Sequence, residues 1–169
     1  MYLYSNLGNS FRCVAEDIAV GEGEVLFEAP ASPEELDGAF PGRAADQLAA
    51  VKAAKVRALT ASCEAAILEG YTSDALGTPH LYPANLTDQI NMLSSVADAG
   101  LEHEEGWTTP FTCRDGEGSW DWRNHTASQI QQAGADGKAA ITAIRAHLKE
   151  LRDQVAAAAD AGAVAEIAW

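Results

Sequence analysis

The sequence has few basic residues, and this imbalance of charge excludes several kinds of partner. It carries 11 Lys and Arg residues against 25 Asp and Glu, for a formal net charge of −14. Nucleic acids and anionic membranes are bound by basic surfaces, so we expect no nucleic-acid partner and no membrane partner. No segment approaches the run of roughly 20 apolar residues that a membrane span needs. The N-terminal run MYLYSNLGNS has neither a basic start nor an apolar core, so no export signal is predicted.

Cysteine is also scarce, and the residue types that bind metals are scattered. Cys13, Cys63 and Cys113 are an odd number without paired spacing, which fits a reducing compartment such as the cytoplasm. Neither they nor the four histidines show C-x-x-C, H-x-x-x-H or similar spacing, so we expect no metal site. The sequence also lacks a phosphate-binding loop, a dinucleotide fingerprint and a nucleophile elbow, and we expect no cofactor.

One pair of residues could be read as catalytic. Cys113 could act as a nucleophile with His125 as its base, as in a small cytoplasmic enzyme. However, Cys113 lies in an aromatic strand pattern, where a free cysteine is more often a small buried hydrophobe. His125 precedes a helix start, where packing or a hydrogen bond explains it. We therefore predict a protein without enzymatic activity and keep the Cys113–His125 enzyme as the alternative.

The sequence is rich in helix signals instead. Residues 126–160 read as one long helix, opened by a capping box in which Thr126 and Gln129 satisfy free backbone N–H groups. Spacings of three and four residues place an apolar stripe on one face of this helix. The stripe consists of Ile130, Ala133, Gly137, Ile141, Ile144, Leu148, Leu151, Val155 and Ala158. Gly134 and Gly137 leave two readings open: another element packs closely against them, or the helix begins weakly.

A second long helix is predicted over residues 43–69, where Gly70 ends it. Its apolar stripe consists of Leu48, Val56, Leu59, Cys63 and Ile67. The stripe of the long helix has two available partners: this second helix, or the same helix of another copy in a dimer or trimer. We expect the intrachain pair to form the main core, because Leu59, Cys63 and Ile67 otherwise have nothing to cover them.

Shorter elements lie between the two long helices. A helix is predicted from the cap Asn85 to Ala99. Its expected buried edge is Leu86, Ile90, Leu93 and Ala97. Two β-hairpins are predicted over residues 71–83 and 106–124, and their turns contain Gly77 and Gly118.

The N-terminal part of the chain reads differently. Residues 1–28 contain three short β-prone runs, and so small a sheet needs a partner surface to be stable. The expected fold class is α+β: a small N-terminal β segment (1–29), a linker with a short helix (30–43), and a mainly helical domain (44–169). The helical domain is expected to hold two long helices, one shorter helix and the two hairpins.

Aromatic residues are the main candidates for an interaction surface. Trp120 and Trp122 face the same side of a strand and are expected to be core, whereas Trp107 adjoins an acidic loop and is expected to be exposed. Trp169 is expected either to contact a neighbouring chain or to be disordered. The predicted partner-binding residues are Tyr2, Tyr4, Phe11, Phe27, Trp107 and Trp169.

Two runs of the sequence resemble a known family. They are GYTSDALGTPHLYPANLTDQINM (70–92) and GWTTPFTCRDGEGSWDWRNHTASQIQQAGADGKAAI (106–141). Both are similar to a domain of unknown function in small tailed-phage proteins, which are encoded beside tail-fibre genes and labelled tail-fibre assembly proteins. The residues that carry the resemblance are Leu76, Gly77, Tyr82, Asp88, Gln89, Trp120, Trp122, His125, Thr126 and Gln129. It spans most of residues 22–158 and implies no cofactor and no catalytic residue.

The resemblance implies a bacteriophage tail-fibre-associated protein. Such a protein would be an assembly chaperone or a small tail component that binds a tail-fibre or other tail protein, or alternatively a receptor-contacting tail tip. It would act in the host cytoplasm during assembly, or also be retained in the virion tail. The N-terminal β segment and the helical stripe would cover apolar or strand-edge surface that otherwise aggregates, and the acidic surface would keep the complex soluble.

Overall fold

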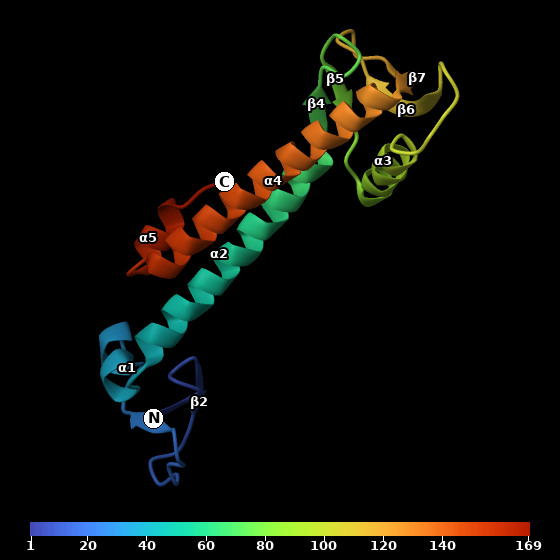
Figure 1. The fold of residues 1–169 in the computed structure, drawn as a ribbon. Helices are drawn as coiled ribbons and strands as arrows, with labels where there is room; N and C mark the ends of the chain where they lie inside the picture. The colour runs from blue at the N-terminus through green and yellow to red at the C-terminus, as the bar shows by residue number, and fades with distance from the viewer. The chain divides into compact units, whose positions relative to one another are not determined.

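The computed structural model describes residues 1–169 and has an α+β architecture, which confirms the predicted fold class (Figure 1). In chain order the elements are β1 (Tyr2–Ser5), β2 (Ser10–Cys13), β3 (Val25–Phe27), α1 (Pro33–Ala39), α2 (Arg43–Leu68), β4 (Tyr71–Ser73), β5 (His80–Tyr82), α3 (Leu86–Asp98), β6 (Thr108–Arg114), β7 (Trp120–Thr126), α4 (Ala127–Ala157) and α5 (Ala161–Glu166). They form two compact units, residues 1–55 with 158–166 and residues 56–157 with 167–169. The first boundary falls inside α2, whereas the sequence-based division began the helical domain at residue 44.

The first unit contains a three-stranded antiparallel sheet in the order β2-β1-β3. Its small core joins Tyr4 of the central strand to Leu36 and Phe40 at helix α1. The helix begins at a capping box, in which Ser32 and Glu35 each accept a hydrogen bond from the other's backbone N–H. The β segment therefore has a partner surface within its own unit.

The second unit contains a four-stranded antiparallel sheet in the order β4-β5-β6-β7. Both predicted hairpins are present, and pairing of Leu81 with Arg114 joins them into one sheet. Gly77 and Gly118 have φ of +87° and +92°, in the left-handed region that favours glycine. The turn chemistry read from the sequence therefore sets the two hairpins.

Helix α4 carries the core of the second unit along one face. Its capping box is formed, since Gln129 Oε1 accepts from Thr126 N at 2.9 Å and Thr126 Oγ1 accepts from Gln129 N at 3.4 Å. A Cβ on Gly134 would lie 2.5 Å from Val96 Cγ2, and a Cβ on Gly137 would lie 2.5 Å from Tyr71 Cζ. Of the two readings left open by these glycines, close packing by other elements is the one found.

Two separate clusters of buried side chains are arranged along α4. The C-terminal half of α2 meets α4 through Leu59, Cys63, Leu148, Leu151 and Val155, so the intrachain helix pair is present. The larger cluster lies instead between α4, α3 and the sheet, and includes Tyr71, Tyr82, Met92, Phe111, Cys113, Ile130 and Ala133. The expectation that the helix pair forms the main core is therefore wrong.

Helix α3 is capped by Asn85 as predicted, but it faces the core with a different side. The expected buried edge is exposed: Leu86, Ile90 and Leu93 are 72%, 55% and 69% exposed. Met92 and Val96 pack on the core instead, because Gly134 of α4 leaves room for them to approach. Two apolar stripes run along this helix, and only one is covered.

Candidate functional site

The pair of residues that could be read as catalytic lies in the core of the second unit. Cys113 on β6 and His125 on β7 are both 0% exposed. The two nitrogens of the His125 ring already have partners, Tyr82 Oη at 2.8 Å from Nε2 and the Arg123 carbonyl oxygen at 2.8 Å from Nδ1. The natural assignment is therefore an Nδ1–H that donates to the carbonyl and an Nε2 that accepts from the phenol.

The electrostatics of this cluster favour uncharged groups. Burial raises the pKa of the Cys113 thiol, although the nearby Arg123 guanidinium opposes this effect. Burial also lowers the pKa of the His125 ring, against the hydrogen bond to the Arg123 carbonyl. A thiolate nucleophile needs a lowered thiol pKa and access to substrate. Cys113 has neither, and the cluster is arranged as a neutral polar core.

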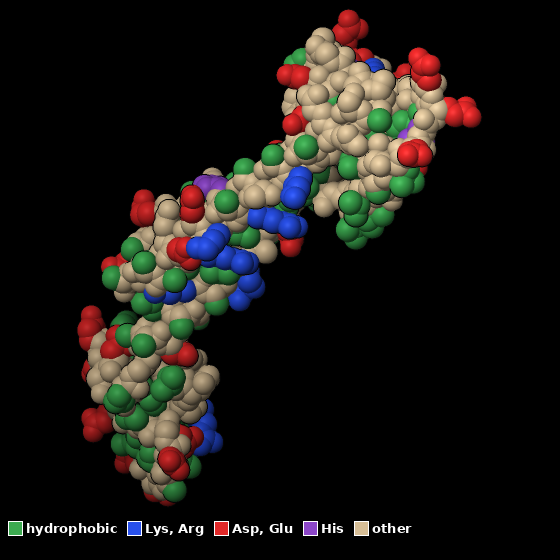
Figure 2. All heavy atoms as spheres, viewed as in Figure 1, with side chains coloured by type: hydrophobic (Ala, Val, Ile, Leu, Met, Phe, Trp, Pro, Cys, Tyr) green, Lys and Arg blue, Asp and Glu red, His purple; other side chains and the backbone are tan.

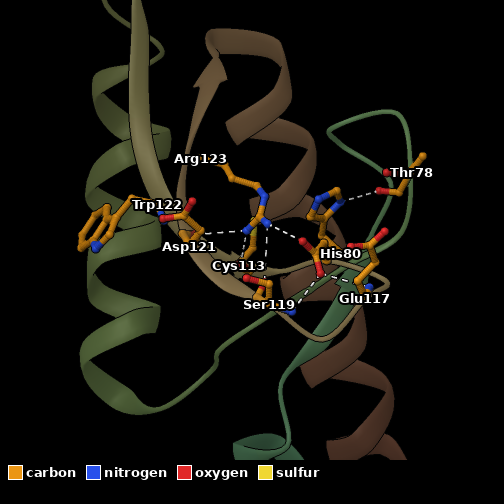
Figure 3. Close-up of polar contacts among 9 residues, drawn as sticks. Thr78, His80, Cys113, Glu117, Ser119, Asp121, Trp122 and Arg123 are labelled. Atoms are coloured by element: carbon orange, nitrogen blue, oxygen red, sulfur yellow. Dashed lines mark hydrogen bonds and ion pairs between the residues drawn. The ribbon is translucent and has the colours of Figure 1, made fainter.

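Arg123 ties the β6–β7 turn together (Figure 3). Its guanidinium donates to the Cys113 carbonyl at 2.6 Å and to Asp115 Oδ2 at 2.7 Å. The other carboxylate oxygen of Asp115 accepts from the backbone N–H groups of Glu117 and Ser119. These backbone hydrogen bonds, led by that of Ser119, lower the pKa of Asp115. All the hydrogen-bond partners of the Arg123 side chain belong to the β6–β7 hairpin, so its role there is structural.

The tryptophans of this hairpin are placed opposite to the prediction. Trp120 and Trp122 are 47% and 68% exposed, and Trp120 lies under the guanidinium of Arg114. Trp107, expected to be exposed, is half-buried against the core and stacks on His103 with the rings 4.2 Å apart. Alternation along β7 directs His125 inward, so Trp120 and Trp122 necessarily face solvent.

The other predicted partner-binding residues are divided between surface and core. Phe11 on β2 is 61% exposed, whereas Tyr4 is buried and its hydroxyl accepts from the Ala31 N–H. Tyr2 and Phe27 are half-buried and pack against the core of the first unit. Of the predicted residues in this unit, Phe11 alone offers a large exposed apolar side chain.

Trp169 packs against its own chain and remains 41% exposed. Its ring meets the edge of His147 on α4, with the ring centres 5.0 Å apart. This contact lies within the second unit, and the part of the ring that it leaves exposed is what a neighbouring chain could contact.

Most residues that carry the family resemblance have structural contacts. Tyr82 is fully buried and stacks on Tyr71, Leu76 packs on the same core, and the Gln89 side chain donates to the Ala84 carbonyl. Thr126 and Gln129 form the capping box of α4, and Gly77 forms a turn. Asp88 accepts no hydrogen bond at its Oδ2 atom, although that atom is buried.

An open groove of about 540 Å³ lies between α3 and α4. Met92, Leu93 and Val96 of α3 and Ile141 of α4 supply apolar walls. Lys138 and Arg145 of α4 also line it, and neither forms an ion pair or side-chain hydrogen bond. The exposed stripe of α3 (Leu86, Ile90 and Leu93) continues the apolar wall outward, and Figure 2 shows hydrophobic side chains gathered over this helix.

The sequence of α3 contains a signal for this site. Helix α3 is apolar on two faces, Leu86-Ile90-Leu93 and Met92-Val96-Ala99, which is typical of a helix with neighbours on both sides. Only one face has a neighbour in the structure. The other, with the groove beside it, is the candidate functional site.

Neither a cluster of metal-binding side chains nor a helix suited to cross a bilayer is found in the structure. No group of three or more His, Cys, Asp or Glu side chains is arranged to hold a metal. None of the helices has the length and apolar character needed to cross a bilayer.

Comparison with known proteins places the chain in a family. Residues 50–168 match the family model described as "Domain of unknown function (DUF4376)". No curated protein and no solved structure matches the chain. The match covers α3, the groove, the four-stranded sheet and α4, and well over half of the sequence. The protein therefore belongs to the DUF4376 family.

Proposed function

We propose that this protein is a non-enzymatic, tail-fibre-associated protein of a tailed bacteriophage, which binds a fibre or other tail protein during assembly. It acts as an assembly chaperone in the host cytoplasm or stays in the virion as a small tail component. The resemblance of residues 70–92 and 106–141 to tail-fibre assembly proteins supports this proposal.

The observation that carries a binding function is the exposed apolar stripe of α3. Leu86, Ile90 and Leu93 are each more than half exposed, and they lie at steps of four and three on one side of the helix. A row of exposed large apolar side chains beside a groove is typical of an interaction surface. Burial of such a row on a partner would be favourable at about 25 cal/mol for each Å² of apolar surface.

The binding function is favoured over the enzyme that uses Cys113 and His125. Both side chains are fully buried, the His125 ring nitrogens are occupied, and the thiol pKa is raised. A substrate could reach them only if the sheet opened. The groove has no nucleophile paired with a base along its walls.

Co-expression with a fibre tests the proposal. The gene beside this one is expected to encode a long fibre protein, and the two proteins are expected to co-purify from cells that express both. The fibre's soluble fraction should fall when Leu86, Ile90 and Leu93 are all changed to Ser, because the exposed stripe is lost while the core is unchanged. A fibre that is equally soluble with and without the wild-type protein would contradict the chaperone role.

The retained-component role has a separate readout. If the protein stays in the particle, purified virions should contain it at a fixed ratio to the fibre. If the protein co-purifies with free fibre from the lysate but is absent from purified virions, the retained-component role is contradicted and only the chaperone role remains.

A further inference from the structure

We propose that the groove between α3 and α4 is a binding site for an acidic amphipathic helix of a protein partner. The inference rests on the proposed function only in taking the partner to be a protein, and it adds where that protein binds and what its segment must carry. Three features of the groove lead to it: its apolar walls, the two cations along it, and two buried polar atoms without partners.

The walls fit apolar side chains of an elongated ligand. Met92, Leu93 and Val96 line the groove from α3, and Ile141 lines it from α4. A hydrophobic groove is the usual receptor for an amphipathic helix that inserts residues at i, i+3 or i+4, and i+7. A volume of about 540 Å³ is enough for several such side chains, and the exposed part of the α3 stripe extends the contact beyond the groove.

The basic side chains along the groove indicate that the partner helix is acidic. The protein has a formal net charge of −14, yet both charged groups on the α4 wall, Lys138 and Arg145, are basic. No acidic side chain of the protein pairs with either of them. Since most of the charge elsewhere repels an acidic partner, attraction here would both favour binding and fix where the partner docks.

The distance between Lys138 and Arg145 predicts the spacing of the acidic residues on the partner helix. Lys138 and Arg145 are seven residues apart, which is two turns of α4 and about 10.5 Å along its axis. A helix that lies lengthwise in the groove presents side chains at the same interval. The partner is therefore expected to carry Asp or Glu at positions i and i+7, with apolar residues between them on the adjoining side.

The floor of the groove calls for a polar side chain as well. Tyr71 and Asp88 line the groove, and the Tyr71 hydroxyl and Asp88 Oδ2 are buried without a hydrogen-bond partner. Burial, Asp136 and Asp88 together raise the pKa of Tyr71, so its phenol keeps its proton. Buried polar groups are nearly always paired. Because both atoms are closed to solvent, a partner reaches them only where side chains of the groove move aside; a hydroxyl or amide of the partner, which can both accept and donate, would then satisfy them.

A designed peptide tests the site directly. The probe is a fluorescently labelled 20-residue helical peptide with Glu at two positions seven apart and leucines along the adjoining face. A matched peptide has Lys in place of the two Glu residues. Fluorescence anisotropy with the full-length protein is expected to show saturable binding of the acidic peptide and at least tenfold weaker binding of the basic one.

Substitutions in the groove should reverse this preference. The double variant Lys138→Glu with Arg145→Glu is expected to weaken binding of the acidic peptide by tenfold or more and to restore binding of the basic peptide. Both side chains are on the surface, so the fold should be kept, and circular dichroism checks this. Arg57→Glu, an exposed change on α2, is the matched control for charge and should leave both affinities unchanged.

A second pair of variants tests the apolar wall. Leu93→Glu should abolish binding of the acidic peptide, whereas Leu68→Glu, at a similarly exposed leucine of α2, should not change it. Equal binding of the two peptides, or an acidic-peptide affinity that the double variant leaves intact, would overturn the inference. So would self-association of the wild-type protein that Leu93→Glu abolishes, because the occupant would then be a second copy.

The two proposals can fail separately. If the protein co-purifies with a fibre and the groove variants leave that complex intact, the proposed function stands and the groove inference fails. If the groove binds the acidic peptide with the expected charge preference but no fibre co-purifies, the groove inference stands and the tail-fibre function fails.

Discussion

At single residues, the clearest test concerns the two hairpin glycines. Gly77 and Gly118 have positive φ, so an alanine at either position is strained and should lower the free energy of unfolding by about 1 kcal/mol or more. Gly116 lies in the same turn as Gly118, has no positive φ, and has open space around its Cα. Gly116→Ala is therefore the control and should be neutral or slightly stabilising. Thermal melts of Gly77→Ala and Gly118→Ala that match the wild type would contradict the assigned turns.

The neutral His125 ring gives stability a dependence on pH. Burial lowers the pKa of His125 below its unfolded value of about 6.5. As the pH falls below about 6.5, the unfolded chain therefore takes up a proton that the folded protein does not, and the folded state loses stability. The stability from this group is fully present above about pH 6.5 and decreases as the pH falls toward the lower pKa of the folded state.

Urea unfolding at several pH values measures this effect. His125→Gln keeps a side chain that can donate to the Arg123 carbonyl and accept from Tyr82, but it does not titrate. The variant is expected to be less stable at pH 7.5 and to lose less stability than the wild type on acidification from pH 7.5 to 5. Parallel curves for the two proteins would show that His125 is not the source of the pH dependence.

Single-residue burial is also where prediction from sequence failed most clearly. Trp120 and Trp122 were placed in the core because tryptophan buries a large area, but they face solvent. Side chains of β7 do alternate between the two faces of the sheet, but the face with Trp120 and Trp122 is the exposed one. The buried face contains His125, whose hydrogen bonds to Tyr82 and to Arg123 make a polar side chain acceptable in the core. Such partners come from distant parts of the sequence, so residue type alone could not reveal them.

At the scale of elements, the glycine face of α4 determines which surfaces meet. A Cβ on Gly137 would lie 2.5 Å from Tyr71 Cζ and 2.9 Å from its hydroxyl oxygen. Overpacking of this kind costs about 1–3 kcal/mol, whereas alanine gains about 1 kcal/mol over glycine in a helix interior. Gly137→Ala should therefore destabilise the protein despite its better helix propensity.

Chemical unfolding with a matched variant separates the two effects. Ala143→Gly, at an exposed position of the same helix, measures helix propensity without packing and should cost about 1 kcal/mol. If Gly137→Ala is as stable as the wild type or more so while Ala143→Gly is destabilised, Tyr71 does not pack against α4 as described.

The existence and length of the longer elements followed well from local signals, whereas helix α5 was not predicted. Capping residues at Asn85 and Thr126, turn glycines at Gly77 and Gly118, and the helix end at Gly70 are each set by chemistry within a few residues. Local signals could not predict which face of α3 is buried against the core. Its two apolar stripes are similar in character, and the choice between them depends on Gly134 of another helix. The sequence showed both apolar faces of α3, but it did not show which of them stays exposed and so where the candidate site lies.

At the scale of the whole molecule, the apolar stripe of α4 could pack on α2 of the same chain or on α4 of another copy. The structure contains the packing on α2. Leu59 and Cys63 of α2 meet Leu148, Leu151 and Val155 of α4, and Arg152 donates to the Thr60 hydroxyl at 2.8 Å across the same pair. Association through the stripe in a dimer or trimer would have to displace these contacts. Formation of oligomers through another surface, such as the exposed face of α3, is compatible with them.

A charge placed in this stripe distinguishes an internal core from an interface between copies. Val155 is 1% exposed, so Val155→Asp buries a carboxylate without a partner. We expect a loss of about 4 kcal/mol or more, which is a large part of the roughly 5–15 kcal/mol that stabilises a typical domain. Circular dichroism should show lost helix and size-exclusion chromatography an expanded monomer, whereas Gln154→Asp at the exposed neighbouring position should behave as the wild type. A fully helical monomeric Val155→Asp protein, beside a wild type that elutes as a dimer or trimer, would instead place the stripe between copies of the chain.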